Sequence, residues 1–164
     1  MKLLASRTAQ YPLVAEFAFN WNNWVVDSAD GAKKTLGSTV ALATDPNETL
    51  LTGAVAATIV FDCIPLPPGA VITGGELIVE TAYAGSTAAT VSLGIAGTTT
   101  ALLSAVDLKT AARTALTITS PLLANSGQNL RATIAYTVAN ATAGKARLRV
   151  MYTIDGRASE VQTS

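Results

Sequence analysis

The 164-residue chain contains no histidine and a single cysteine, Cys63. Histidine is the commonest general base and metal ligand, and it activates most serine and cysteine nucleophiles. Its absence excludes histidine-based catalytic triads, and a structural zinc site of cysteine and histidine ligands cannot form. Cys63 has no partner for a disulfide within the chain, which favours a reducing compartment such as the bacterial cytoplasm. We therefore expect a protein that is not an enzyme.

Charged residues are also scarce, at 13%, and eleven basic and eleven acidic side chains give a formal net charge of zero. Nucleic-acid binding needs a concentrated cationic surface, so this balance argues against direct nucleic-acid contact. No apolar run approaches the length of about eighteen residues that a membrane span needs, and we expect no membrane partner. No phosphate-binding loop or regular calcium loop is present, so we expect no cofactor and no metal.

Small residues supply most of the apolar character. The chain is 49% hydrophobic but only 5% aromatic. By direct count it has about thirty alanines and about two dozen threonines, far above average usage. Such residues fit closely packed sheets and surfaces that lie flat against a neighbour. With so few charges, we expect part of the surface to be covered by partners.

The segment 144–156 alternates apolar and polar residues almost without interruption. Successive side chains of a strand point to opposite faces, so this pattern predicts a long, half-buried antiparallel strand. Its apolar side holds Ala146, Leu148, Val150, Tyr152 and Ile154, and its polar side holds Lys145, Arg147, Arg149, Thr153 and Asp155.

Shorter strands separated by turn residues recur at intervals of roughly ten residues in the rest of the chain. This spacing predicts an all-β fold, an antiparallel β-sandwich or jelly-roll with an extended N-terminal arm. One stretch, 101–113, departs from the pattern, because its leucines and valine have helical spacing and predict one or two helical turns. The expected strands are 11–19, 58–64, 71–83, 89–95, 114–118, 130–138 and the segment after residue 143.

The expected division of the chain falls between residues 53 and 54. Residues 1–53 form an N-terminal arm and a long loop excursion, or they supply additional edge strands to the same sandwich. Both arrangements stay open, because turn residues interrupt the polar stretch 27–53. Residues 54–164 form the β-sandwich, or jelly-roll, domain.

Three basic residues, Lys145, Arg147 and Arg149, form a row on one face of the last strand. Because net charge is zero and no aromatic residue alternates with the row, we expect it to meet another protein or solvent. Glu76, Glu80 and Asp107 are its natural opposite charges, within the chain or across an interface. Glu76 and Glu80 also invite comparison with a glycosidase pair, but such an enzyme needs an aromatic-lined groove.

Three further residues are candidates for either the core or a functional surface. Trp21 and Trp24 lie among asparagines, which favours an exposed interface role over the core, since tryptophan is a frequent interface anchor. Cys63 alternates with Ile59 and Phe61, which predicts a small buried side chain and not a reactive thiol.

Four runs of the sequence form an ordered set that resembles small structural proteins of tailed bacteriophages. The nearest match is the class of head decoration, or cement, proteins, and the resemblance covers about residues 57–161. The runs are 66–77 (LPPGAVITGGEL), 91–96 (VSLGIA), 102–107 (LLSAVD) and 144–152 (GKARLRVMY).

The resemblance implies a jelly-roll that sits on the exterior of a virion capsid, commonly as homotrimers, after assembly in the bacterial cytoplasm. Its implied partners are the major capsid protein and its own copies, and an arm reaches neighbouring subunits. The implied function is to decorate and stabilise the capsid. The alternatives are a head-fibre, tail-fibre or receptor-binding β-module that recognises host glycan, and a cellular β-sandwich enzyme or carbohydrate-binding module.

Overall fold

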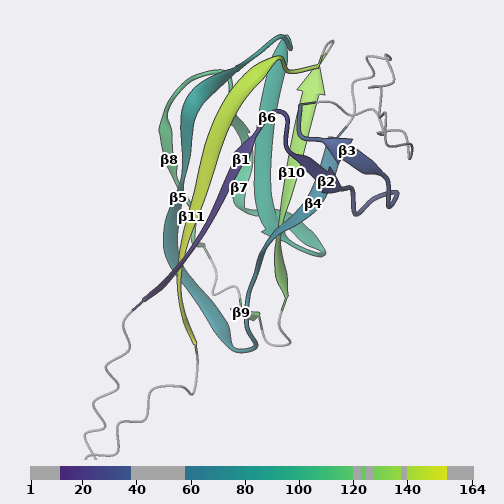
Figure 1. Ribbon diagram of the computed structural model, residues 1–164. Coiled ribbons are helices and arrows are strands. Elements are labelled where there is room, and N and C mark those ends of the chain that lie inside the picture. The colour runs from purple at the N-terminus through teal and green to yellow at the C-terminus, as the bar shows by residue number, and fades with distance from the viewer. Residues whose placement is uncertain (1–11, 38–57, 120–122, 125–127, 138–139, 155–164) are drawn as a thin grey trace, which may run out of the picture.

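The computed structural model describes residues 12–37, 58–119, 123–124, 128–137 and 140–154. These residues form antiparallel strands and connecting turns, without any helix in the described part of the chain (Figure 1). Accordingly, no described residue belongs to a helix that could cross a membrane. The strands are β1 (Leu13–Asn20), β2 (Trp24–Val26), β3 (Lys33–Thr35), β4 (Thr58–Pro65), β5 (Ala70–Ala84), β6 (Ala88–Ile95), β7 (Thr98–Asp107), β8 (Arg113–Ala115), β9 (Leu123–Ala124), β10 (Asn129–Thr137) and β11 (Ala143–Ile154).

Eight of these strands form two packed sheets. The first sheet has the order β1-β11-β5-β8, and the short β9 also pairs with β5. The second sheet has the order β4-β10-β6-β7, while β2 and β3 form a separate hairpin. Among the eight main strands the pairs are nested: β1 pairs with β11, β4 with β10, β5 with β8 and β6 with β7. Such a rolled-up hairpin is a jelly-roll, so the predicted β-sandwich is confirmed.

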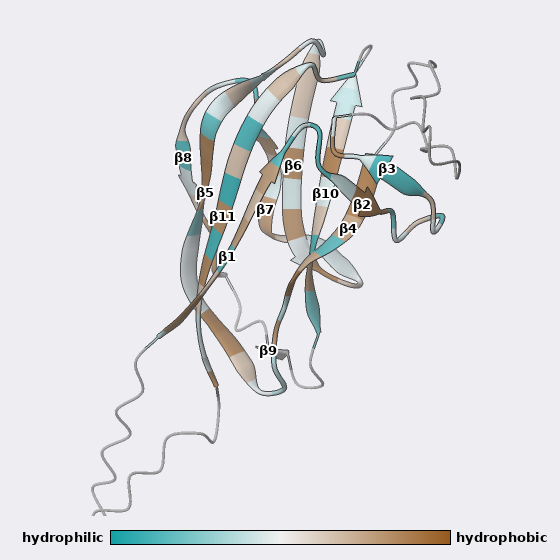
Figure 2. Cartoon of the chain, in the orientation of Figure 1, coloured by the Kyte–Doolittle hydropathy of each residue, from teal (hydrophilic) through white to brown (hydrophobic). Residues whose placement is uncertain are grey.

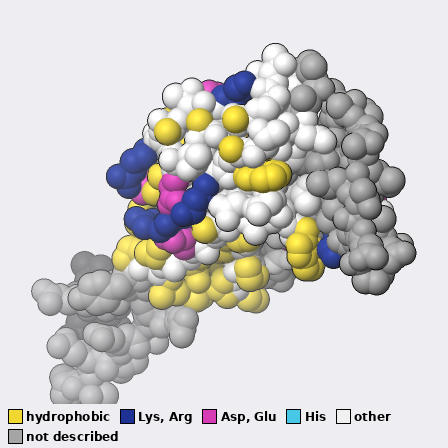
Figure 3. Space-filling view, turned by 45° about the horizontal axis from the view of Figure 1, so that its top comes forward, with side chains coloured by type: hydrophobic (Ala, Val, Ile, Leu, Met, Phe, Trp, Pro, Cys, Tyr) yellow, Lys and Arg dark blue, Asp and Glu magenta, His cyan; other side chains and the backbone are white. Residues whose placement is uncertain are grey.

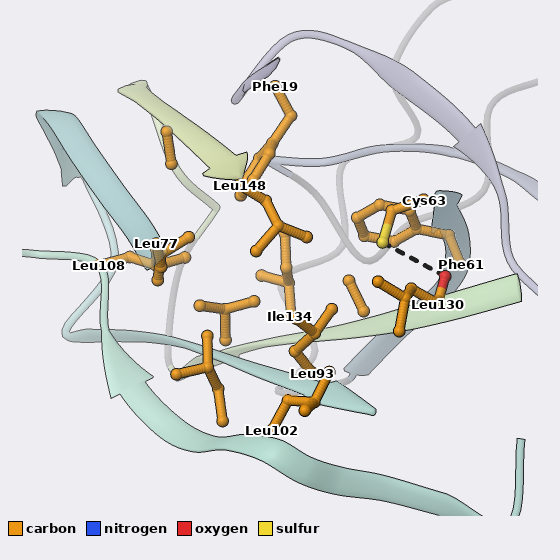
Figure 4. Packing of buried hydrophobic residues seen from close by; sticks show 14 of the residues in the cluster. Phe19, Phe61, Cys63, Leu77, Leu93, Leu102, Leu108, Leu130, Ile134 and Leu148 are labelled. Atoms are coloured by element: carbon orange, nitrogen blue, oxygen red, sulfur yellow. Dashed lines mark hydrogen bonds between the residues drawn. The ribbon is translucent and has the colours of Figure 1, made fainter. Parts of the chain in front are cut away.

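The inner faces of the two sheets supply one hydrophobic core. Leu77 and Leu148 of the first sheet meet Leu93 and Ile134 of the second, and each side chain is buried (Figure 4). Along β11 the burial alternates with the sequence, which follows from the two-residue period of a strand. In Figure 2 the same alternation is visible as bands of teal and brown along β11.

Cys63 is buried in this core, as its alternation with Ile59 and Phe61 predicted. Its thiol donates a hydrogen bond to the Leu130 carbonyl oxygen at 3.2 Å (Figure 4). Burial raises the pKa of the Cys63 thiol to about 12, so the reactive thiolate is not populated near neutral pH.

The predicted helical turns in 101–113 are wrong, because most of this stretch belongs to strand β7. The strand contains a bulge, where the register against β6 shifts between Val91 and Leu93. Ala105 occupies the bulge with a positive φ of 47°, and its N–H donates to Ser92 Oγ at 2.9 Å. The extra residue of a bulge interrupts the two-residue period of the strand. Because of this interruption, the apolar residues of the stretch have helical spacing.

Leu13–Asn20, within the predicted N-terminal arm, forms the edge strand β1 of the first sheet. The predicted boundary between residues 53 and 54 lies outside the described residues, as does any arm before residue 12. The division into an N-terminal segment of residues 1–53 and a domain of residues 54–164 therefore stays a prediction.

Candidate functional site

Four cations and three carboxylates form one network on the outer face of the first sheet, which we call the charge ladder. The side chains between them on β11 are buried in the core, so strand alternation directs the charged ones outward. In Figure 3 dark-blue and magenta side chains gather in one cluster on this side of the molecule. The ladder consists of Glu16 of β1, Glu76 and Glu80 of β5, Arg113 of β8, and Lys145, Arg147 and Arg149 of β11.

One half of the ladder is centred on Arg147. Glu80 contacts Lys145 Nζ at 2.7 Å and Arg147 Nη2 at 2.7 Å. Arg147 Nη1 lies 3.1 Å from Glu16, so a single guanidinium joins acidic residues of two strands. The strand register explains this arrangement, because Arg147 lies between Ala18 of β1 and Ile78 of β5.

The other half of the ladder contains two residues that the sequence did not point to. Arg149 lies 3.2 Å from Glu16 and 3.7 Å from Glu76. Arg113 contacts Glu76 through two hydrogen bonds, of 2.6 and 3.0 Å. Glu16 and Arg113 are far from the basic row in sequence, and only the pairing of β1 with β11 and β8 with β5 reveals them.

The ladder favours the ionised form of two of its carboxylates, Glu76 and Glu80. A hydrogen bond from Arg113 lowers the pKa of Glu76, and one from Lys145 lowers the pKa of Glu80. Glycoside hydrolysis needs one carboxyl group with a raised pKa as the general acid. The arrangement therefore suits a fixed ionic surface and not acid catalysis.

Two exposed hydrophobic residues lie beside the ladder, where β1 begins and β11 ends. Val14 and Met151 are exposed and pair across the two strands, while the exposed Leu13 lies on the opposite face of β1. Figure 3 shows hydrophobic side chains adjacent to the charged cluster. Apolar area beside a polar rim is the usual composition of a protein–protein interface.

The outer face of the second sheet has a different character. Its central positions are small residues, including Thr90, Ser92, Thr133 and Ala135, which pair with one another across β6 and β10. Its one ion pair in the described residues joins Arg131 to Asp62 at 2.8 Å, near the β4 edge. A hydrogen bond from Arg131 lowers the pKa of Asp62. Most of this face is thus flat and nearly uncharged.

The two tryptophans occupy different environments. Trp21 is half-buried and packs against the core, where its ring approaches Gly37. Trp24, on β2, is 60% exposed, and Val26 beside it is 55% exposed. The ammonium of Lys33 lies 4.4 Å from the centroid of the Trp24 ring. Trp24 therefore has the exposure of an interface anchor, whereas Trp21 contributes to packing.

An ion cluster beneath Trp24 fixes the β2–β3 hairpin to the second sheet. Lys34 Nζ lies 2.7 Å from Asp27 and 2.6 Å from Asp30, and Lys34 and Asp27 are 8% and 1% exposed. Asp27 Oδ1 accepts the N–H groups of Ala29 and Val60, and Val60 belongs to β4. The sequence did not point to Lys34, because only the β2–β3 hairpin brings it to Asp27 and Asp30.

Burial disfavours the charged form of Lys34, but hydrogen bonds to Asp27 and Asp30 outweigh it and raise the pKa of Lys34. The bond from Lys34 lowers the pKa of Asp30. Among the described residues, no three histidine, cysteine, aspartate or glutamate side chains come together in a way that could hold a metal ion.

Asp107 lies outside the charge ladder, so its expected pairing with the basic row within the chain is wrong, whereas a pairing across an interface stays a prediction. Its carboxylate accepts hydrogen bonds from the N–H of Lys109 and the hydroxyl of Thr110, each at 2.9 Å. Both partners follow it directly in sequence, and a short-range turn therefore satisfies this acid.

Fold and surfaces together define a jelly-roll β-sandwich with ionic and apolar exposed areas. No protein-family model matches the chain, and no curated protein sequence matches it. Among solved structures, the chain is similar to one chain of "Cyanophage Pam1 capsid asymmetric unit". The two share 18% sequence identity with a TM-score of 0.50, over 94% of each chain. At this identity the likeness is evidence of a shared fold.

Proposed function

We propose that the chain is a non-catalytic structural component of a phage virion, bound to the capsid. The observation that supports this most strongly is the likeness over 94% of both chains to a chain from a cyanophage capsid asymmetric unit. Because folds serve many functions, the surface properties supply the second line of support.

In its finer form, the proposal is that this chain decorates the capsid exterior and stabilises it by binding the major capsid protein and its own copies as homotrimers. Zero net charge permits close association of many copies. The flat outer face of the second sheet allows a neighbouring backbone to approach closely. Each copy makes modest contacts with adjacent capsomers, and the contacts of many copies add up. Because the copies bind only the intact lattice, their binding favours the intact state. Nucleic acid and membrane are not among the proposed partners.

Among the candidate interface residues, Trp24 is the best anchor. Its ring is exposed on a hairpin that the Asp27–Lys34 pair holds in place, so little order is lost on binding. Glu76, Glu80, Lys145, Arg147 and Arg149 already form ion pairs within the chain, and we assign them to the rim of a contact. Trp21 has a mainly structural role in this proposal.

The test compares virions with and without this chain. Particles that contain it should withstand higher temperature and stronger osmotic shock before they release DNA. Adding back the purified chain should restore resistance, and Trp24→Ala should bind at least tenfold more weakly, as an interface anchor does. Ile118→Ala, which changes an exposed apolar residue outside both the hairpin and the apolar area at β1 and β11, is the matched control. Equal resistance with and without the chain would contradict the stabilising role, and a few copies per particle would favour a glycan-binding fibre module.

A further inference from the structure

The four edge strands of the sandwich differ in how their outer backbone groups are satisfied. The β4 edge is covered by the β2–β3 hairpin, because Ser28 N–H donates to the Val60 carbonyl at 2.6 Å and Val60 N–H donates to Asp27. The β7 edge has the Ala105 bulge, and its Leu102 carbonyl accepts Thr117 N–H at 2.9 Å. The β8 edge is three residues long. β1 is the one long edge without such cover in the described residues.

The hydrogen-bond pattern identifies which β1 groups face outward. Trp21 N–H donates to the Gly144 carbonyl at 3.1 Å and continues the β1–β11 register. Alternate residues of an antiparallel strand direct both backbone groups to the same side, so odd-numbered residues of β1 face β11. The even-numbered residues direct their N–H and C=O groups to the free edge.

One end of this edge is closed. Asn20 N–H donates to Asn23 Oδ1 at 2.7 Å, and the Asn20 carbonyl accepts Asn23 N–H at 3.0 Å. The outward backbone groups of Val14, Glu16 and Ala18 have no partner in the described part of the chain. The open edge therefore consists of three donors and three acceptors.

The open edge also lacks the usual protection against strand pairing. Natural edges are protected by lysine, proline, bulges or inward-pointing charge. Here the residues from Val14 to Ala18 contain one charge, Glu16, and its carboxylate is held by Arg147 and Arg149 on the β11 side. Val14, at 58% exposure, adds apolar surface to the same edge.

We propose that this edge is an interface between two copies of the chain, in which β1 pairs antiparallel with β1 of a second copy across a two-fold axis. The strand then continues the first sheet from one copy into the other. Backbone hydrogen bonds supply affinity in such strand addition, and side-chain pairing sets the register.

Charge selects the register. Pairing centred on Glu16 places two carboxylates opposite each other, which is unfavourable. Pairing centred on Phe17 places Glu16 opposite Ala18 of the second copy and satisfies the backbone groups of both residues with four hydrogen bonds. It also brings the two half-buried Phe17 rings together, and a cross-strand aromatic pair is favourable.

This interface is separate from a threefold contact, because a two-fold pairing of one strand joins only two copies. In the capsid it would link neighbouring homotrimers, and this use rests on the proposed function. The β1–β1 pairing is tested on the isolated chain. The test can therefore contradict the pairing without contradicting capsid binding, and capsid binding can be contradicted without affecting the pairing.

The test is Ala18→Pro, with Val14→Pro as the matched control. Both substitutions remove an outward N–H of β1, but only Ala18 lies within the four proposed hydrogen bonds. Proline is tolerated where an edge N–H faces solvent, so both variants should fold with the parent's circular dichroism spectrum and melting temperature. By light scattering and sedimentation equilibrium, the parent and V14P should have twice the mass of A18P. Equal masses for the parent and A18P would overturn the proposal.

Disulfide capture tests the register by a second route. In the full chain, Phe17→Cys should form a covalent dimer on mild oxidation, because the two residues face each other within disulfide range. Ala15→Cys, on the same strand face but opposite Phe19 of the second copy, is the control and should be captured at least tenfold more slowly. The native Cys63 is buried and should not compete. Equal or faster capture of A15C would overturn the register.

Discussion

Two ionic networks in this chain have similar distances and different environments. In the charge ladder, Arg147 lies 2.7 Å from Glu80 on a face where both side chains are partly exposed. In the hairpin cluster, Lys34 lies 2.7 Å from Asp27 with almost no exposure of either group. Distance alone therefore does not distinguish the two networks, whereas access to solvent does.

Exposure to solvent determines how much each network contributes to the free energy of unfolding. Water and salt screen the ladder, so each of its pairs adds little stability and the network mainly fixes the pattern of charge on the sheet. The Lys34–Asp27 pair of the hairpin cluster is shielded, and the loss of one partner leaves a charge buried without compensation. We therefore expect substitutions in the ladder to cost less stability than substitutions in this buried pair.

Lys34→Met should have the largest effect. It leaves the Asp27 carboxylate buried without its cation, which costs about 3–5 kcal/mol. Hydrogen exchange should show loss of protection in β2 and β3, with a shift in tryptophan fluorescence. Lys33→Met, on the other face of β3, is the control and should cost clearly less than Lys34→Met, because Lys33 is partly exposed. Equal losses for both variants would show that burial does not distinguish the two lysines.

Arg147→Met should have a smaller effect, although Arg147 of β11 contacts acidic residues of both β1 and β5. We expect a loss of about 1 kcal/mol in urea unfolding, because the pairs are partly exposed. A double-mutant cycle that combines Arg147→Met with Glu16→Gln measures the coupling energy between these two side chains, which should be a fraction of that loss. A loss as large as that of K34M would remove the contrast between the networks.

Salt should separate the networks further. At about 1 M salt the screening length falls to about 3 Å, so the difference in unfolding free energy between the parent and R147M should fall by at least half. The difference between the parent and K34M should change little, because salt does not reach the buried pair. If both differences fall equally, the hairpin cluster is open to solvent.

Acid should weaken the ladder gradually. The pKa values of Glu76 and Glu80 lie below their ordinary value of 4.5, so their pairs contribute stability above that pH. This contribution is lost as the pH falls from about 4.5 through the lowered values, because the unfolded state binds more protons than the folded state in that interval. Glu80→Gln should reduce the slope of stability against pH below about 4.5, as measured by urea unfolding. Thr81→Val, a neighbouring uncharged change, should leave the slope unaltered.

The fold could be predicted from the sequence because alternation is a local signal. The long strand β11 alternates over almost its full length, and its apolar residues enter the core as expected. The bulge at Ala105 could not be predicted, because one added residue shifts the period and imitates a helix. Which strands pair, and therefore the jelly-roll order, depends on contacts between distant segments.

The charged surface was predictable in part for the same reason. The basic row of Lys145, Arg147 and Arg149 is visible in one strand. Its partners Glu16 and Arg113 become neighbours only through the strand register. The sequence pattern did not distinguish Trp21 from Trp24, although Trp21 is half-buried beside Gly37 and Trp24 is exposed.

The most direct test of the proposed function is a cryo-EM map of virions that contain this chain. We predict two-sheet density of this shape on the outer surface of the capsid, in a copy number that matches the lattice, with the Trp24 hairpin against another protein. The absence of this density from the capsid shell, or its confinement to a few copies at the tail, would contradict the proposal.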